Sequence, residues 1–268
     1  MHKFFHLLSD ELVRARHYYL GVVLFVLIAE IINLIFKLGF SLRDPITRNM
    51  NPFDFNLLFP SSSLFILTVV AAAMAMLIYA IISWQGESTG KARFIYRLLT
   101  LPGSRFTIPL SKIASVLLMV FGLLALQLLI FGVAHYLCRI FFAETYVTPT
   151  LAAGLAQMDA TNTVASLALP MSFPQFLINY GWGMNFLFLL FNVMMLTDSF
   201  DLSGWLKKLG YPLLYTLLIF AVVAALVIFG VFYLTTHEFM MMQYFAILLL
   251  GIVQLLVMQR IANHHLTI

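Results

Sequence analysis

Residues 84–112 read W-Q-G-E-S-T-G-K-A-R-F-I-Y-R-L-L-T-L-P-G-S-R-F-T-I-P-L-S-K, a basic hydrophilic stretch between two long apolar runs. Its charged residues are one acid, Glu87, and five cations, Lys91, Arg93, Arg97, Arg105 and Lys112. Short loops that are rich in Lys and Arg remain on the cytoplasmic side of a membrane. The stretch therefore predicts a membrane protein and the side of the membrane on which this loop lies.

The composition of the 268-residue chain also indicates an integral membrane protein. Hydrophobic residues make up 62% and charged residues only 10% of the sequence, whereas a soluble globular domain is about one-quarter charged. The apolar residues form blocks that exceed the roughly 20 residues needed to cross a bilayer. We expect one transmembrane domain over residues 1–268.

Six apolar segments predict an all-α protein with six transmembrane helices, at about residues 18–38, 62–84, 113–137, 174–197, 211–234 and 239–258. An even number of spans places both termini on the same side. With the termini and the loop 85–112 inside, only four of the 15 Lys and Arg lie outside: Lys37, Arg43, Arg48 and Arg139. We therefore expect a multi-pass protein of the cell membrane, specifically the bacterial plasma membrane, with cytoplasmic termini.

Two segments outside the spans have structure of their own. In residues 1–17, Phe5, Leu8 and Leu12 follow helical spacing, which predicts a helix in the interface plane; an ordinary charged flank is the alternative. Residues 139–173 form an outer loop, in which Asp159 and Asn162 make a seventh span expensive. A partly buried or re-entrant loop remains possible there.

The basic loop itself predicts a short helix. Ser88 or Thr89 can cap its start near residue 90. It ends by Leu101, because Pro102 disfavours helical geometry in the residue before it.

This helix is amphipathic. Phe94, Leu98 and Leu101 share one face, while Arg93 and Arg97 lie one turn apart on a different side. Such a helix either rests on the lipid surface with its arginines towards phosphates, or inserts its apolar face into a groove on a partner. The residue pattern alone leaves both uses open.

The same loop resembles that of the membrane subunits of ABC exporters of the type-two (ABC-2) permease family. The pattern E-x-(several)-R-L-L-T-L-P-G-S-R-x-x-I-x-L-S-K carries the resemblance, through Glu87, residues 101–105 and Ser111-Lys112, between the second and third of six spans. Glu11 and Arg14 are similar to that family's amphipathic connecting helix. The chain departs from the family where many members carry a re-entrant hairpin between the last two spans, since only residues 235–238 are available here.

The resemblance implies that the loop helix is a cytoplasmic coupling helix seated on an ABC ATP-binding subunit. The implied docking residues are Glu87, Arg93, Phe94, Arg97, Leu98, Leu101, Pro102 and Arg105. No phosphate-binding G-x-x-x-x-G-K-[ST] motif occurs in the sequence, so ATP and Mg are expected on the partner and no cofactor on this chain. Six spans are half of the usual twelve, so we expect a second permease, identical or related.

The cargo of such an exporter is expected to be amphipathic, such as a peptide antibiotic, a bacteriocin-like peptide or a lipid. Export of the first kind would give resistance to antimicrobial peptides. A non-transporting membrane adaptor or immunity protein is the alternative, and a membrane-embedded enzyme is the less favoured one. The net charge of +4 does not indicate a nucleic-acid partner, because the cations lie at span ends, where orientation and anionic lipids account for them.

Four polar residues within the spans are candidates for a substrate pathway: Glu30, Gln127, Asn185 and Asn192. The alternative for Gln127, Asn185 and Asn192 is a hydrogen bond between helices. For Glu30 the alternative is a structural hydrogen bond, for example to Asn33 one turn later, with the acid protonated. Neither catalytic nor metal-binding residues are predicted, because the seven histidines form no ligand pattern and Cys138 is the only cysteine.

Overall fold

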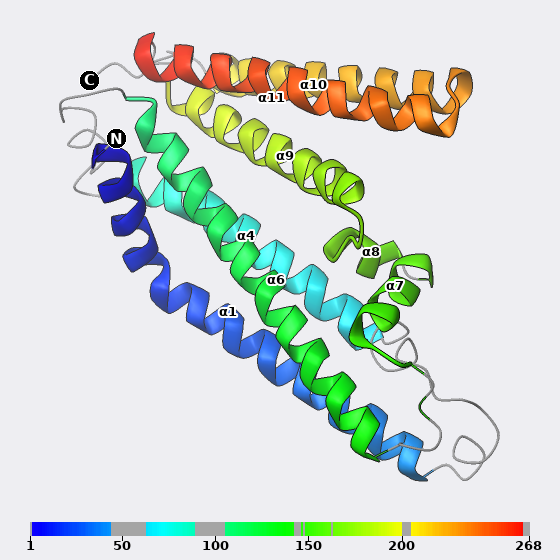
Figure 1. Cartoon of the computed structure of the whole chain (residues 1–268). Helices are drawn as coiled ribbons and strands as arrows, with labels where there is room; N and C mark the ends of the chain where they lie inside the picture. The colour runs from blue at the N-terminus through cyan, green and yellow to red at the C-terminus, as the bar shows by residue number, and fades with distance from the viewer. Residues whose placement is uncertain are drawn as a thin grey trace. The chain divides into compact units, whose positions relative to one another are not determined.

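The computed structural model describes residues 2–43, 63–88, 105–141, 146, 148–161, 163–199 and 205–264. Every regular element in these ranges is an α-helix (Figure 1), which confirms the all-α prediction. Six of the helices are long and apolar enough to cross a membrane: α1 (His2–Arg43), α4 (Ser63–Ser88), α6 (Thr107–Phe141), α9 (Phe173–Ser199), α10 (Trp205–Tyr233) and α11 (Thr236–His264). Two shorter helices, α7 (Leu151–Thr161) and α8 (Thr163–Ala168), lie between α6 and α9.

The first span is longer than predicted, because residues 1–17 do not form a separate helix. From His2 to Arg43 the chain is one continuous α-helix of 42 residues. No proline occurs in this segment, so every residue after its first turn can donate the helical backbone hydrogen bond. The helix expected at the N-terminus is present, but it continues directly into the membrane span.

The predicted outer loop 139–173 contains helices but no seventh span among its described residues. The helices α7 and α8 have 11 and 6 residues, and at 1.5 Å per residue neither approaches the roughly 30 Å of a bilayer core. The hydroxyl oxygen of Thr150 caps α7 by accepting a hydrogen bond from the Ala153 N–H at 3.2 Å.

The turn between α10 and α11 is short, as the sequence predicts. Only residues 234 and 235 separate the two helices. Glu238 accepts hydrogen bonds from the backbone N–H and the hydroxyl of Thr235, at 2.9 and 2.8 Å, as the acid of a capping box does. This cap starts α11 immediately after α10 ends and fixes a tight helical hairpin.

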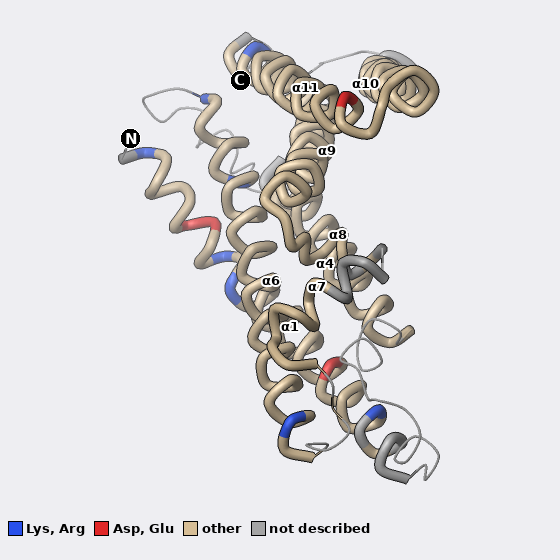
Figure 2. The backbone as a smooth tube through the Cα atoms, turned by 45° about the vertical axis from the view of Figure 1, so that its right-hand side comes forward, with Lys and Arg blue, Asp and Glu red and all other residues tan. Residues whose placement is uncertain are grey.

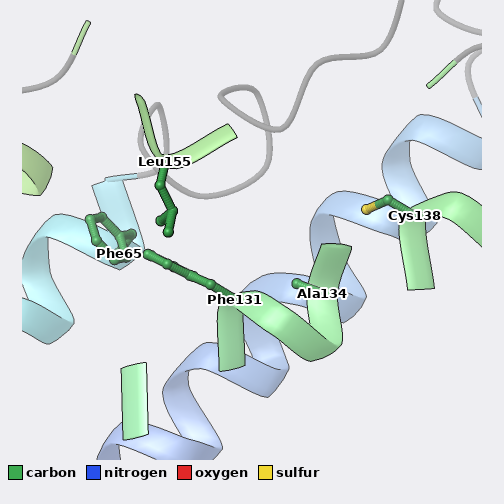
Figure 3. Close-up of a cluster of buried hydrophobic side chains, with 5 residues drawn as sticks. All are labelled: Phe65, Phe131, Ala134, Cys138 and Leu155. Carbon is green, nitrogen blue, oxygen red and sulfur yellow. The ribbon is translucent and has the colours of Figure 1, made fainter. Parts of the chain in front are cut away.

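The described chain divides into two compact units, and each has its own core. One unit comprises Leu12–Tyr79 and Ser115–Gln175. Its buried cluster joins α4, α6 and α7 (Figure 3), with members Phe65, Phe131, Ala134, Cys138 and Leu155. The rings of Phe65 and Phe131 lie 5.8 Å apart. Leu155 therefore anchors the outer helix α7 on two of the spans.

The second unit comprises Met1–Glu11, Ala80–Ala114 and Phe176–Ile268. Leu189 of α9, Ile219 of α10 and Leu250 of α11 form its apolar cluster. Figure 2 shows that the described parts of these three helices carry few charged residues along their length. Their many exposed apolar side chains suit a lipid environment.

Gly181 allows α9 and α11 to approach closely. A Cβ atom at this position would lie 2.7 Å from Cγ2 of Ile247, whereas a Cβ at Gly183, two residues further along α9, would meet no atom within 4 Å. The two glycines thus form a matched pair that differs only in the proximity of α11. Small residues at such positions are typical of packed membrane helices.

We expect Gly181→Ala to destabilise the protein by about 1–3 kcal/mol, because the added methyl group overpacks the α9–α11 contact. Gly183→Ala should instead be neutral or slightly stabilising, since alanine is the better helix former. Thermal unfolding of the two purified variants in the same detergent measures the difference. Equal melting temperatures would contradict the close approach of α9 and α11.

Candidate functional site: a buried ion pair beside the basic loop

Lys112 lies inside α6, and its side chain is buried. Lys112 is predicted as one of the loop cations, but α6 begins at Thr107 and only 1% of Lys112 is exposed. The helix can start this early because Pro109 falls in its first turn, where a backbone N–H has no helical partner in any case. Lys112 is therefore a buried cation near the end of a span and not a solvated loop residue.

The ammonium group of Lys112 bonds to two other helices. Its Nζ donates to Oε1 of Glu11 in α1 at 2.6 Å and to the backbone carbonyl oxygen of Ser83 in α4 at 2.9 Å. We call Glu11, Ser83 and Lys112 the loop-base cluster. Because α4 precedes and α6 follows the segment 89–104, this cluster joins both helices that flank the basic loop, and it adds α1 to them.

The charges of Lys112 and Glu11 in the loop-base cluster compensate each other. The side chains of Lys112 and Glu11 are 1% and 5% exposed, so neither ion is solvated by bulk water. A short charge-assisted hydrogen bond offsets the desolvation of the two ions, whereas one buried ion alone has no such compensation. The pair therefore specifies how the three helix ends pack.

A second polar contact joins the end of α4 to α9. The indole Nε1 of Trp84 donates to Oδ2 of Asp198 at 2.7 Å, and the ring packs edge-on against Phe191 with centroids 6.1 Å apart. Trp84 is only 1% exposed, while Asp198 is exposed. The residue next to Ser83 thus joins α4 to α9, as Ser83 joins α4 to α6.

Most of the predicted docking residues lie outside the described residues: Arg93, Phe94, Arg97, Leu98, Leu101 and Pro102. Glu87 belongs to the last turn of α4, but its side chain is not described. The carbonyl of Arg105 accepts a hydrogen bond from the Ile108 N–H at 3.2 Å, in the turn that leads into α6. The coupling-helix hypothesis therefore remains a prediction.

The candidate pathway residues Asn185 and Asn192 make hydrogen bonds between helices. Asn185 Nδ2 donates to the carbonyl oxygens of Gly181 and Ile247, at 3.0 and 3.1 Å. Asn192 Nδ2 donates to the hydroxyl of Tyr215 in α10 and to the carbonyl of Gln254 in α11, at 3.2 and 3.1 Å. Both asparagines are buried, and their bonds to neighbouring helices are of the kind that the sequence left as an alternative.

Glu30 and Gln127, the other pathway candidates, are also buried, at 0% and 7% exposed. Neither carboxyl oxygen of Glu30, nor Nε2 of Gln127, has a hydrogen-bond partner among the described residues. The Glu30 carboxyl interacts with Asn33, one turn further along α1. These two residues belong to the unit that contains most of α1, α4 and α6, and the asparagines of α9 belong to the other.

The sequence analysis missed three residues of these networks: Trp84, Asp198 and Gln254. Gln254 is 1% exposed, and its Nε2 donates weakly to Asn185 Oδ1 at 3.5 Å. A lone amide inside an apolar run was a usable signal, because a polar side chain within a span needs a partner. Trp84 and Asp198 gave no such signal, since aromatic and acidic residues are ordinary at span ends.

Among the described residues, no group of three or more His, Cys, Asp or Glu is arranged to hold a metal ion. His135 is bonded through Nδ1 to the hydroxyl of Tyr146 at 2.7 Å.

The fold defines the class of this protein, an all-α membrane protein with six helices able to span a bilayer in the described chain. No protein-family model, curated protein or solved structure matches the chain.

We expect Glu11→Gln to lower the free energy of unfolding by about 3–5 kcal/mol, because it leaves the Lys112 ammonium buried without its counter-ion. The double change Glu11→Gln, Lys112→Met should cost less than this single change. Asp10→Asn, at the neighbouring exposed acid, is the matched control and should stay within about 0.5 kcal/mol of wild type.

Denaturant unfolding in detergent micelles of wild type, Glu11→Gln, Lys112→Met and the double variant closes the double-mutant cycle for this pair. Asp10→Asn is measured beside them. Additive losses in the double variant would show that Glu11 and Lys112 do not stabilise each other.

Proposed function

We propose that this chain is the membrane permease subunit of an ATP-driven ABC exporter, with an amphipathic cargo. The loop-base cluster is the observation that carries the proposal. It gives the basic loop, whose sequence resembles that of ABC-2 permeases, a rigid connection to three spans. A loop that only oriented the protein in the membrane would need positive charge but no buried ion pair at its base.

In the proposed mechanism, the ends of α4 and α6 on either side of the loop transmit its movement to the other spans. An ABC ATP-binding subunit, carrying ATP and Mg, docks on the loop helix that the sequence predicts, and nucleotide binding displaces the loop. The displacement reaches α6 directly and is passed to α1 through Lys112 and Glu11. It reaches α9 from α4 through the hydrogen bond between Trp84 and Asp198. Packed helices move in this way as discrete bodies.

The composition of the spans supports an amphipathic cargo, since Phe, Leu and Met predominate there and internal charges are rare. A peptide antibiotic, a bacteriocin-like peptide or a lipid has this character. A second permease, identical or related, completes the translocation unit in the proposal.

The test is a pull-down of the tagged protein from its native membrane in mild detergent. Wild type should recover a phosphate-loop ATPase, and Phe94→Glu, Leu98→Glu should lose it, because two carboxylates replace the apolar face of the predicted helix. The matched control is Ala92→Glu, Tyr96→Glu, which adds the same charge to the opposite face of that helix. The control should retain the ATPase.

Recovery of no ATPase with folded wild type would contradict the exporter proposal and favour a membrane adaptor or immunity protein. Equal loss from both double variants would contradict docking through the apolar face and leave only a general requirement for positive charge in the loop.

A further inference from the structure

Three buried polar side chains lie at one level of the unit that contains most of α1, α4 and α6. Leu34 of α1 packs on the cluster that includes Phe65 of α4 and Phe131 of α6. Glu30 lies one turn before Leu34, Thr68 one turn after Phe65 in the antiparallel α4, and Gln127 one turn before Phe131. Because α4 runs antiparallel to α1 and α6, each of the three polar residues lies one helical turn from the cluster, towards the same end of the unit.

All three of these polar residues are buried. Glu30, Thr68 and Gln127 are 0%, 5% and 7% exposed. The Thr68 hydroxyl donates to the Leu64 carbonyl of its own helix at 2.8 Å, so it needs no further acceptor. Neither the Glu30 oxygens nor the Gln127 amide nitrogen forms a hydrogen bond with the described residues, and the polar neighbour of the Glu30 carboxyl on its own helix is the neutral Asn33. A carboxyl and an amide are thus left with unused hydrogen-bonding capacity within the spans.

The helices around Glu30 provide no cation close to it. On α1 the nearest is Lys37, seven residues and about 10 Å of helix away. On α6 no charged residue occurs between Lys112 and Arg139, and the titratable His135 is bonded to Tyr146. On α4 no charged residue precedes Glu87, and α7 contributes the apolar Leu155. This contrasts with Glu11 on the same helix, whose carboxylate is paired with Lys112.

An ionised carboxylate at this position would be buried without a counter-ion, which is strongly unfavourable within a membrane. The neutral acid avoids that cost. We propose that Glu30, Thr68 and Gln127 form an intramembrane proton-binding site, in which the Glu30 carboxyl is held in its protonated form. The site concerns the packing of α1, α4 and α6 and does not depend on the proposed exporter function.

The site has two states, with and without the proton, and each favours a different packing of the three helices. With the proton bound, α1 packs on α4 and α6 through a neutral side chain. Loss of the proton leaves a buried charge, which favours a rearrangement that brings the carboxylate to water or to a cation. Proton binding and helix packing are therefore linked, as in other intramembrane carboxyl sites of transport proteins.

A hydrophobic carbodiimide tests the site directly, because it reacts with protonated carboxyls in apolar surroundings. The acid proton moves to a carbodiimide nitrogen and a carboxylate oxygen bonds to the central carbon. Rearrangement then transfers the acyl group to nitrogen and gives a stable N-acylurea. We expect dicyclohexylcarbodiimide to modify Glu30 in the full-length protein in native membranes, with labelling that falls as the pH is raised, as measured by peptide mass spectrometry.

Two carboxyls of the same chain serve as internal controls. Glu11 should resist the reagent, because its buried carboxyl is bonded to the Lys112 ammonium at 2.6 Å. Glu238, exposed at the start of α11, should react instead with a water-soluble carbodiimide and an added amine. Absence of label on Glu30 at every pH, or labelling by the water-soluble reagent alone, would overturn the proposal.

A second measurement does not depend on reagent access. Glu30→Gln replaces a neutral acid by a neutral amide of the same size, so its melting temperature should match that of wild type. A fall as large as that of Glu11→Gln would show that Glu30 is an ionised partner in the fold and would contradict the protonated site. The ATPase pull-down is unaffected by either result, so the two proposals fail independently.

Discussion

Transferring a charged group from water into the protein interior is costly, and this constraint explains how the ends of α1, α4 and α6 pack around Lys112. Lys112 is buried at the start of α6, so its ammonium must be bonded within the protein. Glu11 and the Ser83 carbonyl meet that requirement, and they bring the ends of α1 and α4 to the same point. One lysine thereby determines the packing of three helix ends next to the basic loop.

The same constraint acts differently elsewhere in the spans. Among the described side chains of α9, α10 and α11 the buried polar groups are uncharged, and amide and hydroxyl groups bond across helices. Glycine at position 181 lets α9 and α11 come close enough for Asn185 to reach the Ile247 carbonyl. At Glu30 neither solution is present in the described residues, which leaves protonation as the means of removing the charge.

These two carboxyls of α1 illustrate how function can be divided along one helix. Glu11 is held by a cation and serves as a fixed mechanical contact beside the loop. Glu30 has no cation close to it and is suited to changing its charge. In the proposed exporter, the first would transmit the movement of an ATP-binding partner, and the second would make the packing of the spans responsive to protons.

The sequence by itself determined the number of spans, their approximate limits and the short turn between the last two, because long apolar runs and charged flanks are local properties of a chain. It did not predict that residues 2–43 form one continuous helix, since helical spacing in two adjoining segments does not show whether the helix is interrupted between them. It also placed Lys112 in the loop, because the burial of a lysine depends on whether a distant acid, here Glu11, lies within reach. The partners of Lys112, Trp84, Asn185 and Asn192 on other helices follow from the folded chain and not from the sequence, since these contacts join residues far apart in the chain. The role of the basic loop stays a prediction, because the described residues include the helices on both sides of it but not residues 89–104.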